Sequence, residues 1–307
     1  MARSTQPEAE IPVSEELFAP VSPDIELCYQ TFGDPIDEPV LLVMGLSGPM
    51  TWWDPEFCRG LAARGRYVIR FDNRDTGRSS RVRERVHNAT LVRAFAGRPV
   101  RPPYTLGDMA EDSFGLLDHL GIDAAHVVGI SMGGMIAQRM AIARPARVRS
   151  LTSIMSTTGK RSVGWQHPRL LPMLVARRGP DRETYAARSA RLWDIIGSPA
   201  FPQPREETLA HARETFDRGV SASGAMRQML AIVTEPNRGP GLRALSMPAL
   251  VVHGSADKMV HVSGGRATAR SLLGSELLVI DGMGHDLPRE LFDTVIDAID
   301  RTIKRAN

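Results

Sequence analysis

The sequence has little cysteine and little lysine, and it lacks any long uninterrupted apolar run. Its two cysteines, Cys28 and Cys58, are too few for a disulfide framework, so we expect buried free thiols. No run of about 18 apolar residues occurs, which argues against a membrane span. The first residues are polar and acidic and lack the pattern of a signal peptide, so we expect a cytoplasmic protein.

The positive charge comes almost entirely from arginine. The 307 residues carry a formal net charge of +3, and only three of the 38 basic residues are lysines. Acidic residues are interleaved with the arginines, as in 83–85 and 181–183, so the charge is not gathered on one face and nucleic-acid binding is not expected. The sequence also lacks zinc-type spacings of histidine and cysteine and lacks nucleotide-binding glycine loops, so neither a metal nor a cofactor is predicted.

Short continuous apolar runs alternate with segments of helical character. Such runs predict strands buried on both faces, which are typical of a parallel sheet covered by helices. Two β-prone runs between residues 13 and 32 flank Pro20–Asp24 and predict a hairpin. The later strands are predicted at Val40–Met44, Tyr67–Phe71, His126–Ile130, Leu151–Met155, Ala249–Val252 and Glu276–Ile280. The helices are predicted at Phe57–Arg64, Leu106–Leu120, Met132–Arg144, Val262–Leu273 and Asp286–Ile303. This alternation predicts an α/β fold with a doubly wound, mostly parallel central sheet.

Two stretches interrupt the alternation. Residues 81–104 are basic and proline-bearing, and they contain no predicted helix or strand. Residues 156–245 contain no strand-like run, only helical patches such as Pro172–Arg178 and Thr184–Ile196. A helical insertion in an α/β core is most simply a cap over the active-site edge. The predicted organisation is a disordered head at 1–12, a core at 13–155 and 246–307, and an inserted helical cap at 156–245.

The strongest motif is Gly129-Ile130-Ser131-Met132-Gly133, which follows a predicted strand and precedes a predicted helix. It matches the G-x-S-x-G nucleophile elbow, in which larger residues at the glycine positions would collide with the sheet and the helix. The turn exposes the serine hydroxyl and directs a helix N-terminus at the reaction centre, where the helix dipole favours a developing anion. The alternative is a glycine-rich turn whose serine has no catalytic role. The strand–turn–helix context favours Ser131 as a nucleophile.

A nucleophilic serine needs a base, and the base needs an orienting acid. Asp257 follows the predicted strand at 249–252, and His285 follows the predicted strand at 276–280. Because the carboxyl ends of parallel strands lie at one edge of a sheet, Ser131, Asp257 and His285 are expected to converge. The sequence therefore predicts a catalytic triad of these three residues.

Other histidines and acids compete for these roles. His253 lies at the end of its strand and fits a structural turn residue better, and His261 follows the acid too closely to reach the serine. Asp281 and Asp286 flank His285 on one short loop, which places neither carboxylate well for the far nitrogen of the ring.

An oxyanion hole needs two backbone donors, and the amide of Met132 is expected to supply one of them. The second is expected from the loop Met44–Gly48. This loop, the elbow, and the loops of the acid and the histidine together resemble the α/β-hydrolase family over about residues 13–303. In that family the loop reads His-Gly-x and the amide of x donates. The resemblance implies Leu46 as the donor, with Met44 replacing the family's histidine.

A further segment, Phe71–Ser79, resembles the family's D-x-R-G-x-G-x-S loop, and Asp72 and Arg74 are expected to pair and fix it. With Trp52-Trp53 and the elbow, these motifs look most like bacterial esterases of the aclacinomycin-methylesterase type, which cleave methyl esters of aromatic polyketides. The four tryptophans are candidates for lining an aromatic pocket, with core packing as the alternative: Trp52, Trp53, Trp165 and Trp193.

The resulting prediction is a serine hydrolase that cleaves a carboxylic ester through an acyl-enzyme and needs no cofactor. The expected partner is a small-molecule substrate, such as a methyl ester or another ester of a bulky, apolar, polyketide-like molecule. No nucleic-acid or membrane partner is expected, and the protein is expected to be a monomer or a homodimer. Two alternatives stay open: hydrolysis of a lactone, thioester, amide or carbon–carbon bond on the same triad, and a non-catalytic ligand-binding member of the fold.

Overall fold

An eight-stranded sheet runs through the computed structural model, which describes residues 11–170 and 181–306. The strand order is β1-β2-β4-β3-β5-β6-β7-β8. The pairs β1–β2 and β2–β4 are antiparallel, and all other neighbours are parallel. The strands are β1 (Leu17–Ser22), β2 (Ile25–Phe32), β3 (Glu38–Val43), β4 (Arg66–Phe71), β5 (Ala125–Ile130), β6 (Val148–Ile154), β7 (Ala249–Gly254) and β8 (Glu276–Ile280). The predicted mostly parallel α/β sheet is confirmed.

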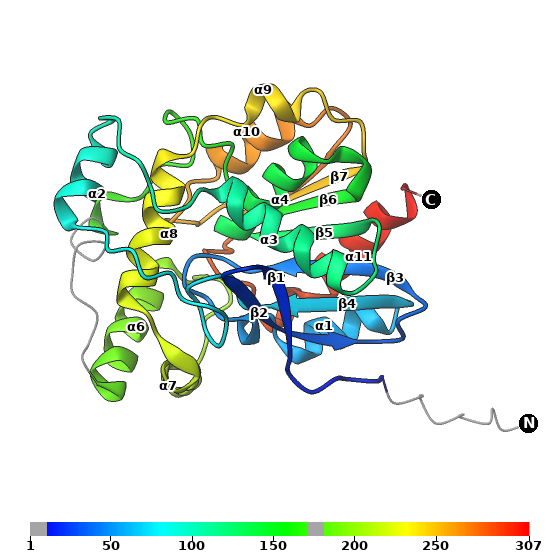
Figure 1. Cartoon of the computed structure of the whole chain (residues 1–307), viewed down its shortest axis with the longest axis horizontal. Coiled ribbons are helices and arrows are strands. Elements are labelled where there is room, and N and C mark those ends of the chain that lie inside the picture. Colours follow the sequence, from blue (N-terminus) through cyan, green and yellow to red (C-terminus); the bar gives the residue numbers. More distant parts are fainter. Residues whose placement is uncertain (1–10, 171–180, 307) are drawn as a thin grey trace, which may run out of the picture.

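Apolar residues on both faces of the sheet meet separate layers of helices (Figure 1). Helices α1 (Pro55–Ala62) and α11 (Phe292–Lys304) cover one face, and α3 (Leu106–His119), α4 (Met132–Ala143) and α10 (Ser263–Ser271) cover the other. In α11 the buried residues recur at helical spacing and form a stripe that packs on the sheet: Val295, Ile296, Ile299 and Ile303. The sheet is therefore doubly wound.

The chain reverses direction across the sheet between β3 and β5. It leaves β3 for β4 on one side and then returns to form β5 on the other side of β3. At such a switch point the loops after the two strands diverge and leave room for a ligand. The loop that begins at Met44 and the turn at Ser131 therefore lie side by side at the carboxyl edge.

Within residues 155–170 and 181–248, the described part between β6 and β7, there are four α-helices: α6 (Arg182–Ile196), α7 (Arg205–Gly219), α8 (Ala222–Thr234) and the short α9 (Gly239–Leu242). Figure 1 shows α6, α7 and α8 beside the sheet, with α2 (Asn88–Phe95) next to α8. Helix α2 lies within residues 81–104, a stretch for which the sequence analysis names no helix. Its helical stretch is short and no side chain caps its N-terminus, so the local sequence signal is weak.

Short 3₁₀ turns complete the elements: η1 (Met50–Trp52), η2 (Pro145–Arg147), η3 (Pro168–Leu170) and η4 (Arg289–Leu291). The helix predicted from Asp286 begins instead at Phe292, because Pro288 and η4 intervene. The patch Pro172–Arg178 and the first ten residues of the predicted head lie outside the described residues, whereas Pro12 accepts a backbone hydrogen bond from Gly33. Within 11–170 and 181–306, no helix is long and apolar enough to cross a membrane.

Candidate active site

Ser131 occupies a strained turn between β5 and α4. Its φ of 55° and ψ of −117° lie where non-glycine residues are rare. The flanking glycines permit the turn, because a Cβ on Gly129 would lie 2.1 Å from the carbonyl oxygen of Gly133, and a Cβ on Gly133 would lie 2.0 Å from that of Val43. The steric reason predicted for both glycines of the motif therefore holds in the structure.

The structure brings the side chains of Ser131, Asp257 and His285 together from loops after β5, β7 and β8. The Nε2 atom of His285 lies 3.0 Å from Oγ of Ser131. Its Nδ1 atom lies 2.8 Å from Oδ2 of Asp257. A proton on Nδ1 satisfies the carboxylate and leaves Nε2 as the acceptor for the serine hydroxyl. This tautomer is the one that general-base chemistry requires.

Asp257 is buried and surrounded by donors. Its Oδ1 accepts hydrogen bonds of 2.8 Å from the backbone amides of Met259 and Val260. Burial alone raises the pKa of Asp257, but the charge of His285 and hydrogen bonds from His253 and His285 lower it, and the net pKa lies below the ordinary value. The carboxyl group therefore stays ionised beside the imidazole.

His253 contributes more to this environment than a turn residue would. Its Nε2 atom lies 2.7 Å from the carbonyl oxygen of Val260 and 3.4 Å from Oδ2 of Asp257. The N–H therefore donates to the carbonyl and also faces the carboxylate. Sequence reasoning placed His253 at the strand end but missed its contact with the acid, although the four-residue spacing to Asp257 was a usable signal.

The competing groups are engaged elsewhere. The carboxylate of Asp281 accepts a hydrogen bond from Ser255, and that of Asp286 accepts one from Ser198. The ring of His261 stacks on Trp165 with a centroid distance of 4.1 Å. These contacts agree with the preference for Asp257 and His285.

The two expected oxyanion donors lie in adjacent loops. Met132 is the first residue of α4, where backbone N–H groups have no partner within the helix. Leu46 lies in a turn after β3 that is closed by a hydrogen bond of 3.2 Å from the amide of Gly48 to the carbonyl oxygen of Gly45. A Cβ on Gly45 would lie 3.2 Å from Cβ of Ser131, so the turn and the elbow are in close contact.

Met44 replaces the family's histidine without disturbing this loop. Its side chain is buried in the cluster that includes Trp53 and Val128. Its backbone carbonyl oxygen accepts a 2.9 Å hydrogen bond from the side-chain amide of Asn73. The loop is therefore held by packing and by a side chain from the neighbouring segment 72–79.

The predicted pair of Asp72 and Arg74 is wrong. Arg74 binds both carboxylate oxygens of Asp112 on α3, at 2.5 and 2.6 Å. Asp72 instead pairs with Arg218 on α7 at 2.8 Å. The two side chains take partners from different elements, and nothing in the local sequence marks those partners. The segment is still structural, as expected.

Residues from the helices between β6 and β7 also reach the histidine loop. The backbone N–H of His285 donates to the carbonyl oxygen of Ile196, the last residue of α6, at 2.7 Å. The amide of Gly284 donates to Oγ of Ser198 at 2.8 Å. The C-terminal end of α6 thus fixes the backbone that carries His285.

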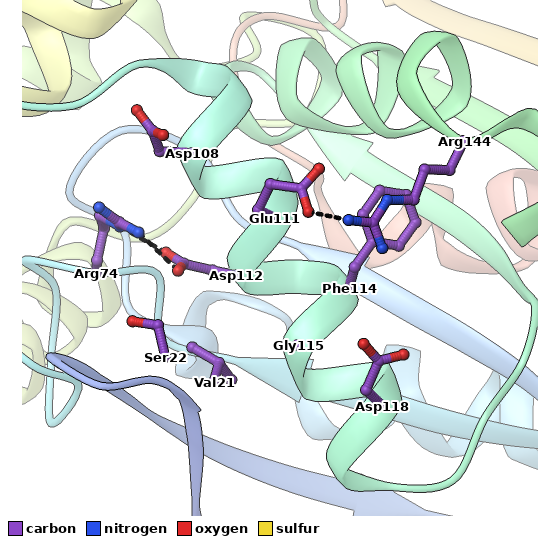
Figure 2. A pocket seen from close by; sticks show the side chains of 10 residues that line it. All are labelled: Val21, Ser22, Arg74, Asp108, Glu111, Asp112, Phe114, Gly115, Asp118 and Arg144. Atoms are coloured by element: carbon purple, nitrogen blue, oxygen red, sulfur yellow. Dashed lines mark hydrogen bonds and ion pairs between the residues drawn. The ribbon is translucent and has the colours of Figure 1, made fainter.

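A pocket of about 320 Å³ lies away from the three residues, between α3 and the β1 hairpin (Figure 2). Its acidic side chains are already engaged: Asp112 with Arg74, Glu111 with Arg144, Asp118 with Arg147, and Asp108 in the capping box of α3. The acidic charges that line this pocket are therefore locally balanced.

Cys28 and Cys58 are free and buried, as predicted. Burial raises the pKa of each thiol to about 12, so neither is a nucleophile near neutral pH. Within the described residues, no group of three or more histidine, cysteine, aspartate or glutamate side chains is placed to hold a metal ion.

Comparison with known proteins agrees with this geometry. The family model for the alpha/beta hydrolase fold matches residues 38–288. The rhodomycin D methylesterase DauP of Streptomyces sp. (strain C5) is 29% identical over 297 residues, which cover 90% of this chain and 94% of that protein. The 3-oxoadipate enol-lactonase 2 of Acinetobacter baylyi is 28% identical and covers 92% of this chain and 95% of its own.

Among solved structures, a hydrolase from Pseudomonas aeruginosa PA01 superposes with a TM-score of 0.71 at 23% identity, covering 94% of this chain and 98% of that one. The likeness extends over nearly the whole chain, including the segment between β6 and β7. The resemblance read from the motifs is confirmed, and the named methylesterase belongs to the type of bacterial esterase that those motifs resemble.

Proposed function

Because this chain belongs to the α/β-hydrolase fold family, we propose that it cleaves carboxylic esters through an acyl-enzyme formed on Ser131. One observation carries the proposal: a single imidazole, that of His285, lies within hydrogen-bond distance of both the Ser131 hydroxyl and the Asp257 carboxylate. A hydroxyl, an imidazole and a buried carboxylate in this order are the parts that nucleophilic acyl transfer requires.

In the first half-reaction, Oγ of Ser131 attacks the ester carbonyl carbon while Nε2 of His285 takes the hydroxyl proton. Asp257 holds the ring by its Nδ1–H and stabilises the imidazolium that forms. The tetrahedral intermediate then collapses, and His285 gives the proton to the departing alcohol. Water repeats the sequence on the acyl-enzyme, which releases the carboxylic acid and restores the serine.

The amides of Leu46 and Met132 are the proposed oxyanion donors. Their support is position: Leu46 lies in the turn after β3, which contacts Ser131 at Gly45, and Met132 lies at the N-terminus of α4, directly after Ser131. Donors that are fixed before the reaction stabilise the negative oxygen without reorganising, which is the largest single term in many acyl transfers.

Residues 156–245 act as a cap in this proposal, and residues 13–155 with 246–307 form the catalytic core. The contacts of Ile196 and Ser198 with the histidine loop support this division, because they place the end of α6 against the reacting groups. A cap in that position excludes water and sets the size of the acceptable ester.

The proposed substrate is a methyl ester or another ester of a bulky, apolar molecule of polyketide type. Two observations support it. The relative DauP is named as a methylesterase and matches most of the chain. Trp52 and Trp193 are half-buried and meet edge to face, with ring centroids 5.6 Å apart, where η1 meets α6. Large aromatic faces favour flat, apolar ligands.

A lactone is the second candidate substrate, because the similar 3-oxoadipate enol-lactonase 2 spans an equal share of the chain. A lactone is a cyclic ester, so the same serine, histidine and oxyanion donors would serve it. We further propose that the protein acts in the cytoplasm on a small-molecule ester, as a monomer or a homodimer, with no cofactor and no nucleic-acid or membrane partner.

Steady-state assays with p-nitrophenyl esters, aryl methyl esters and aromatic lactones test the proposal. We expect hydrolysis by the wild type and a loss of several orders of magnitude in Ser131→Ala with its fold intact. Methyl esters turned over faster than lactones favour the first substrate class, and the reverse order favours the second. If the wild type binds these compounds without hydrolysing them, the proposed enzyme activity is wrong and the protein is a ligand-binding member of the fold.

A further inference from the structure

We propose that Gln228, on helix α8, is a positioning residue for the oxyanion hole. It does not touch the reacting atoms, and it acts by fixing the turn Gly45–Gly48 that carries Leu46. The inference rests on the proposed ester hydrolysis and extends it to a residue far from the triad in sequence. No motif in the chain marks Gln228.

The side chain of Gln228 is fully buried and makes three hydrogen bonds. Its Oε1 accepts from the backbone N–H of Ser47 at 2.8 Å. Its Nε2 donates to the carbonyl oxygen of Arg74 at 2.8 Å and to Oγ1 of Thr76 at 2.9 Å. Because a carbonyl oxygen can only accept and an amide N–H can only donate, these partners fix which way the amide group faces.

The bond to Ser47 constrains one peptide group of the turn. Ser47 has a φ of 56° and is the third residue of the turn that Gly45 and Gly48 close. A positive φ at this position is typical of a type II turn and favours glycine, so a serine there is strained. Rotation of the Leu46–Ser47 peptide would relieve the strain by converting the turn to type I.

Gln228 opposes that rotation. A rotated peptide would turn its N–H away from Oε1 of Gln228 and bring the carbonyl oxygen of Leu46 toward the same side. A buried amide oxygen would then face another acceptor and lose its donor, which is unfavourable inside a protein. The proposed oxyanion donor, the N–H of Leu46, belongs to the preceding peptide. The rotation therefore displaces this donor indirectly, through the change in the ψ angle of Leu46 and in the shape of the turn.

A second side chain holds the same loop at its start. The side-chain amide of Asn73 donates to the carbonyl oxygen of Met44. A cavity of about 10 Å³, roughly enough for one water molecule, lies between the turn, residues 75–77 and the link from α7 to α8. Gln228 therefore connects the cap to the oxyanion turn directly.

The expected consequence is a loss in kcat with little change in KM. A misplaced donor weakens stabilisation of the tetrahedral intermediate more than it weakens substrate binding. Removing an oxyanion donor outright lowers kcat by about 10²–10³, so displacing one is expected to lower it on the order of 10- to 100-fold. Affinity for a boronic acid, which forms a tetrahedral adduct on a serine, should fall in the same proportion.

The test compares Gln228→Leu with Gln138→Leu. Gln138, on α4, is also fully buried and makes two hydrogen bonds through its side chain, with Ser153 and Arg238, but neither reaches the oxyanion turn. We expect both variants to lose stability and only Gln228→Leu to lose kcat and boronic-acid affinity. Gln228→Glu retains an acceptor for the Ser47 amide, and its buried carboxyl group, in the protonated form that burial favours, can donate to the carbonyl oxygen of Arg74, so most of the lost kcat should return.

Equal kcat in the two leucine variants would overturn the inference, and so would a Gln228→Glu enzyme as slow as Gln228→Leu. If Gln228→Leu does not fold, Gln228→Asn replaces it, because the shorter side chain withdraws the acceptor from Ser47. Failure of the proposed function looks different, since the wild type itself would then neither hydrolyse esters nor bind the boronic acid.

Discussion

The core and the helices between β6 and β7 are held together in different ways. Helix α11 of the core buries seven of its 13 residues, most of them apolar. Helices α6 and α7 bury three and two of their 15 residues, respectively. Burial of apolar surface therefore contributes more to stability in α11 of the core than in α6 and α7.

Directional polar contacts are prominent where the helices between β6 and β7 meet the core. Arg218 of α7 pairs with the buried Asp72 at 2.8 Å, and Arg227 of α8 pairs with the buried Asp75 at 2.7 Å. The third such contact is that of Gln228 with the oxyanion turn. Apolar packing tolerates small displacements, whereas buried hydrogen-bonded pairs fix one arrangement. Directional contacts therefore position the helices between β6 and β7, whereas apolar burial positions the elements of the core.

The largest effect is expected from a change in the catalytic core. Asp257→Asn keeps the size of the side chain but presents an N–H toward His285 and favours the wrong tautomer. We expect kcat for ester hydrolysis to fall on the order of 10⁴-fold. The rate should be measured alongside the unfolding curve. A near-normal rate would move the role of the acid to another carboxylate, with Asp281 tested next.

The second-largest effect is expected when a contact between α7 and the core is removed. Arg218→Met leaves the buried Asp72 without its cation, and removing one partner of a buried pair lowers the free energy of unfolding by about 3–5 kcal/mol. Urea unfolding measures the change. The matched control is Arg182→Met, which removes an exposed pair with Asp217 between α6 and α7 and is expected to change stability little. Similar losses in both variants would refute the proposed role of buried pairs.

The third effect concerns the core and depends on pH. His126 on β5 is fully buried, and among the described residues its Nε2 atom has no hydrogen-bond partner. Burial lowers its pKa from 6.5 to about 4. Between these values the unfolded chain binds a proton that the folded chain does not, so stability falls as the pH drops through this window.

A pKa shift of this size corresponds to a change of about 3 kcal/mol in the free energy of unfolding over the full pH window. His126→Val removes the titrating group from a strand position that suits a β-branched residue. We expect the unfolding free energy of the variant to depend less on pH between 6.5 and 4 than that of the wild type. Identical slopes would show that other groups control the acid sensitivity of the core.

The smallest effect tests the cap as a determinant of substrate size. Trp193→Ala removes one of the two rings that meet where α6 approaches η1. We expect the ratio of kcat/KM between large aromatic and acetyl esters to change on the order of tenfold, with the acetyl ester little affected. Trp165→Ala is the control, because that ring is half-exposed and stacks on His261. An equal change for all esters would exclude a role in size selection.

Much of the core was predictable from the sequence because its signals are local. Continuous apolar runs marked the parallel strands, and polar residues directly after them marked Ser131, Asp257 and His285 at one edge of the sheet. The partners of Asp72 and Arg74 and the contact of Gln228 were not predictable. They join residues more than 35 positions apart, and in each case the choice among many arginines, acids and amides depends on how helices pack. Helix α2 was missed because eight residues without a side-chain cap give little helical signal.

The central claim is that Ser131 forms the acyl-enzyme, and covalent labelling tests it most directly. The wild type is treated with a fluorophosphonate, digested, and analysed by mass spectrometry to find the modified residue, with Ser131→Ala treated in parallel. We expect one adduct per chain on the peptide that contains Ser131 and none in the variant. An adduct on another serine, or undiminished labelling of Ser131→Ala, would contradict the account.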